Sequence, residues 1–213
     1  MPDTKTPTTT SKFIVSLNIA DMLSLGALAF AMKSIQFALS GVFDLAAASM
    51  LVGCVFDILD GAVARRCSLV RDFGRYLDSA IDVILYLLAP AVFLYMRGFS
   101  GAIEQTVLFL FVSCGVIRLS VFNKIGNVRD EHGRLAYLGM PVLWSVFWVA
   151  LLQLLSWHVS EAILLPLIVI IVLSHSICMV LNRSFFKIKP NATTMSAVAL
   201  LIALLVLGHL DIL

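Results

Sequence analysis

Four aspartates lie in two pairs whose spacing is typical of a metal-binding site. Asp57 and Asp60 are three residues apart, and Asp78 and Asp82 are four apart. Residues three or four apart share one face of a helix, so each pair presents two carboxylates side by side. Oxygen-rich sites of this kind suit Mg²⁺, Mn²⁺ or Ca²⁺. Four carboxylates carry enough charge for two divalent ions, which can clamp the attacking and leaving oxygens of a phosphoryl displacement.

The segments that carry these aspartates are apolar enough to cross a membrane. Of the 213 residues, 61% are hydrophobic and 13% are charged, whereas soluble domains have about 25% charged residues. Stretches of roughly 20 apolar residues are typical of transmembrane helices. The sequence therefore predicts an all-α integral membrane protein, with one domain over 13–213 that forms a bundle of about seven transmembrane helices. The predicted spans are 13–33, 41–65, 73–96, 103–122, 137–157, 161–181 and 193–210.

Basic residues are distributed unevenly between the two sides of the predicted bundle. Of the 15 lysines and arginines, twelve lie in the first 12 residues or near the loops after the second, fourth and sixth spans, and only Lys33 and Arg97 lie on the other side. The positive-inside rule therefore predicts that the N-terminus and these loops are cytoplasmic. Residues 1–12 are polar and rich in threonine, and we expect a disordered cytoplasmic tail there.

The two aspartate pairs are expected to converge a short way below the cytoplasmic surface. A short loop links the second span to the third, so these spans form an antiparallel hairpin with Asp60 at a depth similar to that of Asp78 and Asp82. A single aspartate in mid-membrane costs roughly 2.5–3.5 kcal/mol, so several together need a positive partner. That partner is either bound metal or the nearby arginines, which are Arg65, Arg66, Arg71 and Arg75.

The segment 57–82 reads D-x2-D-G-x2-A-R-x8-G-x3-D-x3-D. This pattern resembles the signature of the CDP-alcohol phosphotransferases, which transfer a substituted phosphate from a CDP-linked donor to an alcohol and release CMP. The resemblance implies that Asp57, Asp60, Asp78 and Asp82 ligate divalent metal, Mg²⁺ or Mn²⁺, as two ions. It also implies that Asp82 is the general base on the acceptor hydroxyl.

The resemblance assigns the remaining motif positions to the donor. Small residues let a ligand approach the helix backbone closely. Gly61 and Ala64 would make room for the cytidine nucleotide, and Gly74 would permit close packing beneath it. Arg65 would contact the diphosphate, with Asp57 beside it. Because family members often form dimers, the resemblance also implies a homodimer.

Three further segments resemble the phosphatidylserine synthases of bacteria and archaea. They are 114–123, the Gly-x-Pro segment in 137–141, and the basic segment 179–187. The resemblance implies CDP-diacylglycerol or its ether-linked counterpart as the lipid donor and favours serine as the acceptor. Inositol phosphate and glycerol phosphate stay as alternatives, because Val-Leu-Trp-Ser follows Pro141 where more small residues and a second proline are typical. The acceptor-binding residues expected on this basis are Arg118, Asn123, Lys124, Asn182 and Arg183.

Polar residues inside other spans allow two readings each. Arg118 is the only basic residue deep in an apolar span, so it must face a carboxylate, a phosphate or water. It forms either a salt bridge to a motif aspartate or a contact with an acceptor carboxylate or phosphate. Asn18, Asp21 and Ser24 lie along one face of the first span, where they either line the donor entrance or pack against neighbouring helices.

Two other classes of function compete with an enzyme. A divalent-cation transporter would use the carboxylates as its ion path, but the outer halves of the second and third spans, Leu45 to Val55 and Ile84 to Leu94, are nearly all apolar. A non-catalytic scaffold would not need the metal constellation. We therefore expect an enzyme of phospholipid biosynthesis in a prokaryotic cytoplasmic membrane, with its site facing the cytoplasm among membrane lipids and with no nucleic-acid partner.

Overall fold

The computed structural model describes residues 14–126, 128–129, 133, 135–186 and 191–210. The predicted disordered tail, residues 1–12, lies outside the described residues. The helices are α1 Ile19–Leu39, α2 Phe43–Arg66, α3 Asp72–Asp82, η1 Val83–Leu88, α4 Ala89–Met96, α5 Ala102–Ile125, α6 Trp144–Leu155, α7 Glu161–Val180 and α8 Ala192–His209. The strands are β1 Val128–Arg129, β2 Leu135–Leu138 and β3 Ser184–Phe186.

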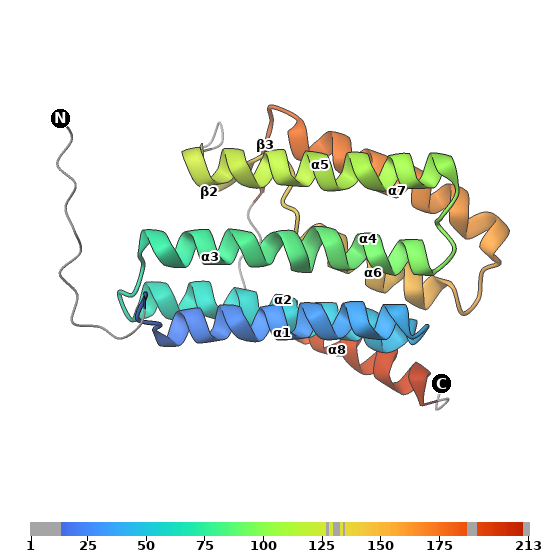
Figure 1. The fold of residues 1–213 in the computed structure, drawn as a ribbon, viewed down its shortest axis with the longest axis horizontal. Helices are drawn as coiled ribbons and strands as arrows, with labels where there is room; N and C mark the ends of the chain where they lie inside the picture. The colour runs from blue at the N-terminus through green and yellow to red at the C-terminus, as the bar shows by residue number, and fades with distance from the viewer. Residues whose placement is uncertain (1–13, 127, 130–132, 134, 187–190, 211–213) are drawn as a thin grey trace.

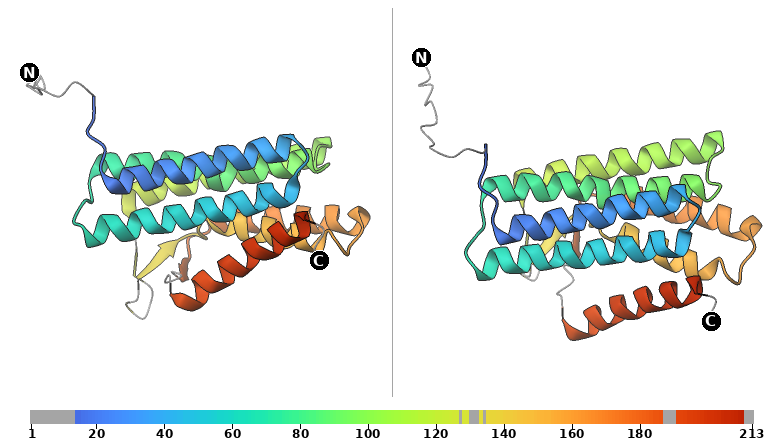
Figure 2. Two further views of the ribbon diagram at one scale, coloured as in Figure 1. Left: turned by 90° about the horizontal axis from the view of Figure 1, so that it is seen from below. Right: turned by 60° about the horizontal axis from the view of Figure 1, so that its bottom comes forward.

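The long helices form an antiparallel bundle (Figure 1). Within the described residues, six helical segments are long and apolar enough to cross a membrane, with α3, η1 and α4 forming one continuous segment, Asp72–Met96. Helix α1 begins at one end of the bundle and α8 ends at the other (Figure 1). Helix α8 packs against α2 along the outside of the bundle (Figure 2). The predicted all-α membrane fold is confirmed.

The structure changes two of the predicted spans. The first, predicted over 13–33, lies six residues later as α1, Ile19–Leu39, and the fifth differs more. The prediction placed a helix over 137–157, but the chain forms strand β2 first and only then the 12-residue helix α6. At 1.5 Å per residue α6 is about 18 Å long, shorter than the roughly 30 Å hydrocarbon core. Gly139 has a φ of +72°, and Pro141 cannot continue a helix, so this short segment ends the strand and delays the helix.

A small antiparallel sheet, which the sequence did not predict, joins two distant loops. Its strand order is β1-β2-β3, with Val128 opposite Ala136 and Leu138 opposite Ser184. Beyond β2, the Gly139 N–H donates to the Arg183 carbonyl at 2.9 Å. The segment before α6 is therefore held against the end of α7.

Small residues allow α1 and α2 to pack closely. Ala27 and Ala31 of α1 and Ala47 of α2 are fully buried. A Cβ atom on Gly53 would lie 3.3 Å from the Ala27 carbonyl oxygen and 2.8 Å from Leu85, so the helices leave no room for a side chain there. Such contacts are typical of helix packing in membranes. They fix α2, which carries the first two motif aspartates, against its neighbours.

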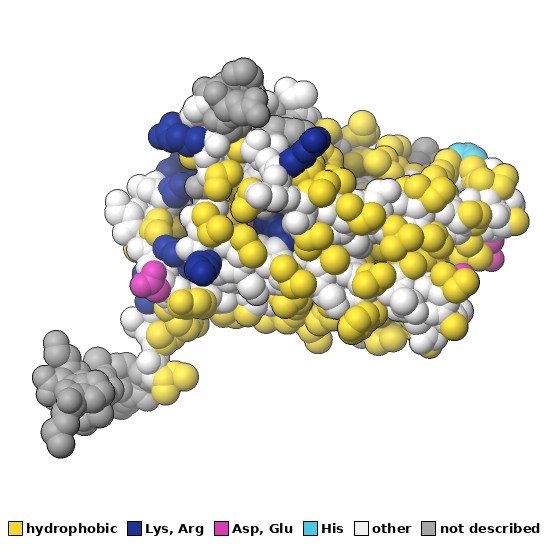
Figure 3. All heavy atoms as spheres, turned by 90° about the horizontal axis from the view of Figure 1, so that it is seen from above, with side chains coloured by type: hydrophobic (Ala, Val, Ile, Leu, Met, Phe, Trp, Pro, Cys, Tyr) yellow, Lys and Arg dark blue, Asp and Glu magenta, His cyan; other side chains and the backbone are white. Residues whose placement is uncertain are grey.

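The basic side chains gather at one end of the bundle. Figure 3 shows lysines and arginines at the end from which the N-terminal segment leaves, and a largely hydrophobic surface over the rest of the face in view. Arg65, Arg71 and Arg75 belong to this end, because α2 ends and α3 begins there (Figure 1). The apolar band between the two ends is what a lipid bilayer requires of a spanning bundle.

Candidate active site

Three of the four motif aspartates meet between α2 and α3. One carboxylate oxygen from each of Asp57, Asp60 and Asp78 lies within 4.8 Å of the other two. Asp82 is the last residue of α3 and lies outside this group of three, but it interacts electrostatically with both Asp57 and Asp78. The structure therefore brings the two predicted pairs together in one acidic site.

The chemistry of this site fits a divalent cation. All the donor atoms are carboxylate oxygens, which Mg²⁺ and Mn²⁺ prefer. Oxygens in adjacent positions of an octahedral Mg²⁺ shell lie about 3 Å apart, so side-chain shifts of about 1–2 Å would bring Asp57, Asp60 and Asp78 onto one ion.

Two of the four arginines close to the motif form ion pairs with aspartates outside it. Arg71 pairs with Asp21, and Arg75 pairs with Asp72 at 3.7 Å. In the part of the chain that the structure describes, no lysine or arginine forms an ion pair with a motif aspartate. The alternative in which arginines neutralise these carboxylates through ion pairs is therefore not the arrangement found, although Arg65 acts electrostatically on Asp60. Since buried uncompensated charge is costly, a divalent cation is a partner that fits this group of carboxylates.

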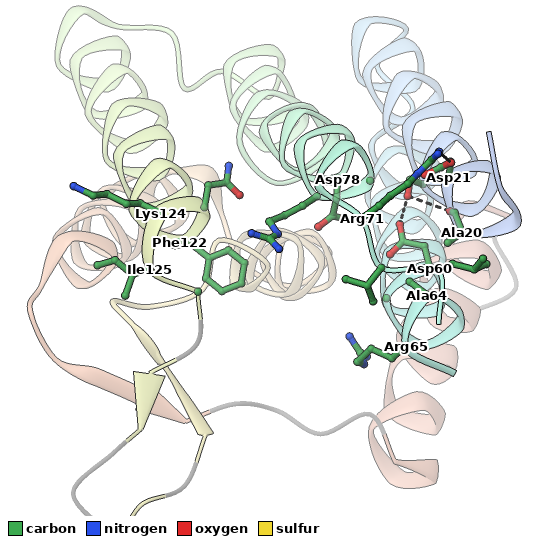
Figure 4. A pocket seen from close by; sticks show the side chains of 18 residues that line it. Ala20, Asp21, Asp60, Ala64, Arg65, Arg71, Asp78, Phe122, Lys124 and Ile125 are labelled. Carbon is green, nitrogen blue, oxygen red and sulfur yellow. Dashed lines mark hydrogen bonds and ion pairs between the residues drawn. The ribbon is translucent and has the colours of Figure 1, made fainter. Parts of the chain in front are cut away.

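A cavity of about 440 Å³ opens beside Asp60 and Asp78 (Figure 4). Its walls come from α1, the α2–α3 hairpin and the end of α5. The residues predicted to hold the donor, apart from Asp57, all line it, and they are Gly61, Ala64, Arg65 and Gly74. In Figure 4, Arg65 points into the cavity from one side and the Asp60 carboxylate from another. The cavity thus presents a cation and a carboxylate site to the same ligand.

Both glycines of the motif leave space in this cavity. A Cβ atom on Gly61 would lie 3.1 Å from Nη1 of Arg65, and one on Gly74 would lie 3.5 Å from Oδ1 of Asp21. Neither contact involves backbone, so the fold itself tolerates a methyl group at either position. The absence of a side chain at these two positions therefore enlarges the cavity.

Hydroxyl groups from outside the motif donate to two of its carboxylates. Ser24 of α1 donates to Asp60 and lines the cavity. Ser24 was expected either to line the donor entrance or to pack against neighbouring helices, and the structure has it lining the cavity with its hydroxyl on the Asp60 carboxylate. Tyr86 of η1 donates to Asp57 at 2.6 Å. Sequence analysis missed Tyr86, although its position four residues after Asp82 was a usable signal.

The residues predicted to bind the acceptor do not form one cluster. Asn123 and Lys124 line the main cavity, and Ser79 donates to the Asn123 side chain at 2.8 Å. In Figure 4 the Lys124 side chain extends away from the carboxylates. Arg183 is exposed and is not among the residues that line either cavity described here.

Arg118 and Asn182 line a second cavity of about 160 Å³, between α5, the end of β2 and α7. Arg118 is 6% exposed, and its guanidinium lies 5.1 Å from the Phe122 ring centroid and 5.3 Å from that of Tyr137. It forms no ion pair with any carboxylate of the described segments, and its Nε has no hydrogen-bond partner there. Asp82 acts on it electrostatically. The predicted salt-bridge alternative is therefore not the arrangement found, and Arg118 is a positively charged residue among the otherwise mostly apolar lining of this cavity.

Tyr137, which stacks on Arg118, lies in β2. Burial raises the pKa of its phenol, and the neighbouring guanidinium acts in the opposite direction. Since burial has the larger effect, the ring stays neutral at physiological pH and leaves the positive charge of Arg118 unpaired by a phenolate.

Comparisons with known proteins agree with this geometry. The family model described as CDP-alcohol phosphatidyltransferase matches residues 17–211. A CDP-diacylglycerol–serine O-phosphatidyltransferase from Helicobacter pylori is 31% identical over 187 residues, which are 84% of this chain and 78% of that protein. A protein of the same name from Methanocaldococcus jannaschii is 35% identical over 121 residues, 56% of each chain. An archaetidylserine synthase from Methanothermobacter thermautotrophicus is 33% identical over 127 residues, 58% of this chain and 52% of that protein. The chain belongs to the CDP-alcohol phosphatidyltransferase family.

Proposed function

We propose that the protein transfers a phosphatidyl group from CDP-diacylglycerol to L-serine and releases CMP, as a step of phospholipid biosynthesis. The observation that carries the proposal is that the motif residues Gly61, Ala64, Arg65 and Gly74 line one cavity with the carboxylates Asp60 and Asp78. The names of the bacterial and archaeal relatives support serine as the acceptor.

The metal site of this proposal consists of Asp57, Asp60, Asp78 and Asp82, which would hold two ions of Mg²⁺ or Mn²⁺. The first three carboxylates already lie close together, and Asp82 is adjacent to them. Bound metal supplies positive charge to the diphosphate and to the leaving CMP. The Ser24 and Tyr86 hydroxyl groups hold two of the ligand side chains in place.

The remaining steps belong to the side chains around the cavity. Arg65 would hold the diphosphate, and the nucleotide would lie over Gly61, Ala64 and Gly74. The serine hydroxyl oxygen attacks the phosphorus that carries the lipid, and its proton passes to Asp82. As the new oxygen–phosphorus bond forms, the bond from that phosphorus to CMP breaks, and its electron pair leaves with CMP.

The position of Asp82 supports its assignment as the base. It interacts electrostatically with Asp57 and Asp78 on the metal side and with Arg118 on the other. Arg118 lines the smaller cavity with Asn182. An arginine fork can bind a carboxylate through two hydrogen bonds. The proposal therefore places the serine carboxylate at Arg118 and Asn182, with its hydroxyl directed to Asp82.

The other predicted acceptor residues have less support. Asn123 lines the main cavity and is oriented by Ser79, so it can contact an acceptor that enters between α3 and α5. Lys124 and Arg183 stay as proposals for steering the acceptor at the entrance, because both are exposed. An acceptor with its own phosphate, such as inositol phosphate or glycerol phosphate, would depend on these two cations more than serine does.

The surroundings of the site favour a lipid enzyme over a cation transporter. Beyond Asp57 and Asp82 large apolar side chains are buried, as at Met50, Leu51 and Leu85, and a buried polar side chain such as Ser49 carries no charge, so a path for a divalent cation across the bundle has little support there. The positive-inside rule supports a site that faces the cytoplasm, with the lipid donor entering from the bilayer. A homodimer stays a prediction.

The test is CMP release by the purified protein in mixed micelles. CDP-diacylglycerol and Mn²⁺ or Mg²⁺ are supplied, and serine, inositol phosphate and glycerol phosphate are added one at a time. Metal-dependent release with serine alone is the expected result. Release with a different acceptor would retain the proposed chemistry and overturn the serine assignment. Folded protein that binds no CDP-diacylglycerol would overturn the proposal that the protein is an enzyme of this kind.

A further inference from the structure

The third span changes its helix type directly after Asp82. Helix α3 ends there, and η1 is a π-helix in which the Ala89 N–H donates to the Ile84 carbonyl, five residues earlier. Short π segments inside α-helices are rare and frequently mark functional sites. The π turn begins directly after the motif aspartate Asp82, and Pro90 follows two residues after its end. Its position therefore connects a residue of the proposed site with a proline that can disturb the helix.

Pro90 provides a physical cause for the wider turn. A proline has no N–H to donate to the carbonyl four residues earlier, here that of Tyr86, and its ring crowds that carbonyl. The hydroxyl of Ser145 donates to the Tyr86 carbonyl at 2.6 Å. Ser145 is fully buried in the first turn of α6. Because a buried carbonyl needs a partner, this bond attaches the start of α6 to the π turn.

The side chain of the same tyrosine reaches the acidic site. Tyr86 is 1% exposed, and its hydroxyl donates to Oδ2 of Asp57 at 2.6 Å. An ionised carboxylate has about four acceptor positions, so this bond leaves capacity for a metal ion on Asp57. A phenol is a neutral donor, and it orients the carboxylate without adding a positive charge that would compete with the ion.

We propose that Tyr86 is a positioning residue for the metal ligand Asp57, held in place by the bond from Ser145 to its own carbonyl. This inference rests on the proposed metal site. Hydrogen-bond partners of metal ligands typically contribute 10- to 100-fold to metal affinity or activity. Helix α6 carries no motif residue, yet through Ser145 and Tyr86 it is linked to the proposed metal site by two hydrogen bonds.

The first test is Mn²⁺ binding to the purified protein in detergent, measured by calorimetry without substrate. Tyr86→Phe keeps the buried ring and removes only the hydroxyl. Tyr95→Phe is the matched control, because Tyr95 is 47% exposed near the end of α4. We expect the Mn²⁺ dissociation constant to rise about 10- to 100-fold in Tyr86→Phe and to stay unchanged in Tyr95→Phe. A wild-type dissociation constant in folded Tyr86→Phe would overturn the proposal.

A second pair of variants tests the hydrogen bond from Ser145 of α6 to Tyr86. This pair also tests the proposal if the Tyr86→Phe protein does not fold. Ser145→Ala removes the hydroxyl that holds the Tyr86 carbonyl. Ser176→Ala removes an equally buried hydroxyl that donates only within α7, to the Val172 carbonyl at 2.7 Å. If Mn²⁺ binding is weaker than wild type in Ser145→Ala but not in Ser176→Ala, the proposal is supported. If the two variants bind Mn²⁺ with the same dissociation constant, the role of Ser145 is overturned. Wild-type protein that binds no Mn²⁺ would instead count against the proposed function, so the two failures are distinguishable.

Discussion

Replacement of Arg118 by lysine separates the charge of this side chain from its geometry. The guanidinium lies over both the Phe122 and Tyr137 rings, and Arg118 is among the residues that line the smaller cavity. A lysine keeps the positive charge but lacks the planar fork and stacks less well on aromatic rings. We expect Arg118→Lys to weaken serine binding and to leave CDP-diacylglycerol binding unchanged, because Arg118 is not among the residues that line the main cavity.

The size of this effect follows from the burial of the site. Arg118 is 6% exposed, so water does not readily replace a lost contact. One hydrogen bond to a charged group contributes about 1.5–3 kcal/mol. The loss of one of two such bonds would raise the KM for serine by about 10- to 150-fold, since about 1.4 kcal/mol corresponds to a factor of ten. The kcat should stay close to wild type, because a positive charge remains near Asp82.

The assay is CMP release with saturating metal, first with serine varied and then with CDP-diacylglycerol varied. Arg129→Lys is the control, because Arg129 is an exposed arginine of β1 whose guanidinium bonds only the Gly133 carbonyl among the hydrogen bonds described. A folded Arg118→Lys protein with an unchanged KM for serine would refute the reasoning. A raised KM for CDP-diacylglycerol would move Arg118 to the donor site.

Four further predictions test the donor side, the base and the fold. Asp82→Asn should retain CDP-diacylglycerol binding and lose about 10²- to 10⁴-fold in turnover; unchanged turnover would exclude Asp82 as the base. Gly61→Ala should raise the KM for CDP-diacylglycerol and not that for serine, because its Cβ would lie 3.1 Å from Nη1 of Arg65 in the main cavity; equal changes in both constants would contradict this. Gly139→Ala should lower the melting temperature, because its φ is +72° and its Cβ would lie 2.2 Å from the Met179 carbonyl oxygen; the left-handed conformation alone costs about 1–2 kcal/mol, and an unchanged melting temperature would show that the segment is adaptable. Removal of divalent metal with EDTA should abolish CMP release, and Mg²⁺ or Mn²⁺ should restore it; turnover that persists in EDTA would argue against the metal site.

The convergence of the aspartates was predictable because it depends on local rules. The spacings within 57–60 and 78–82 fix a helix face, and a short loop turns the chain back on itself. The sheet was not predictable in this way. Its strands β2 and β3 lie more than forty residues apart in sequence, and each is too short to show a strand pattern.

The acceptor residues were predicted as one group, and the structure divides them for a geometric reason. Arg118 and Asn123 are five residues apart on α5, and at 100° per residue their side chains point about 140° apart. Phe122, four residues after Arg118, shares its face and stacks on it. Helical periodicity alone therefore assigns Arg118 and Asn123 to different surfaces, although the resemblance treats the segment as one.

If the smaller cavity binds the acceptor, as we propose, the division of the site between two sets of elements would let one scaffold serve different acceptors. The donor motif lies on α2 and α3, with α1 and η1 supplying the hydroxyl groups of Ser24 and Tyr86. The smaller cavity is built from α5, the end of β2 and α7. Asp82 interacts electrostatically with the carboxylates of Asp57 and Asp78 and also with Arg118, and Tyr137 likewise interacts with both Asp57 and Arg118. Changes in the second set can therefore alter the acceptor without moving the donor, whereas a shift of Asp82 would affect every acceptor equally.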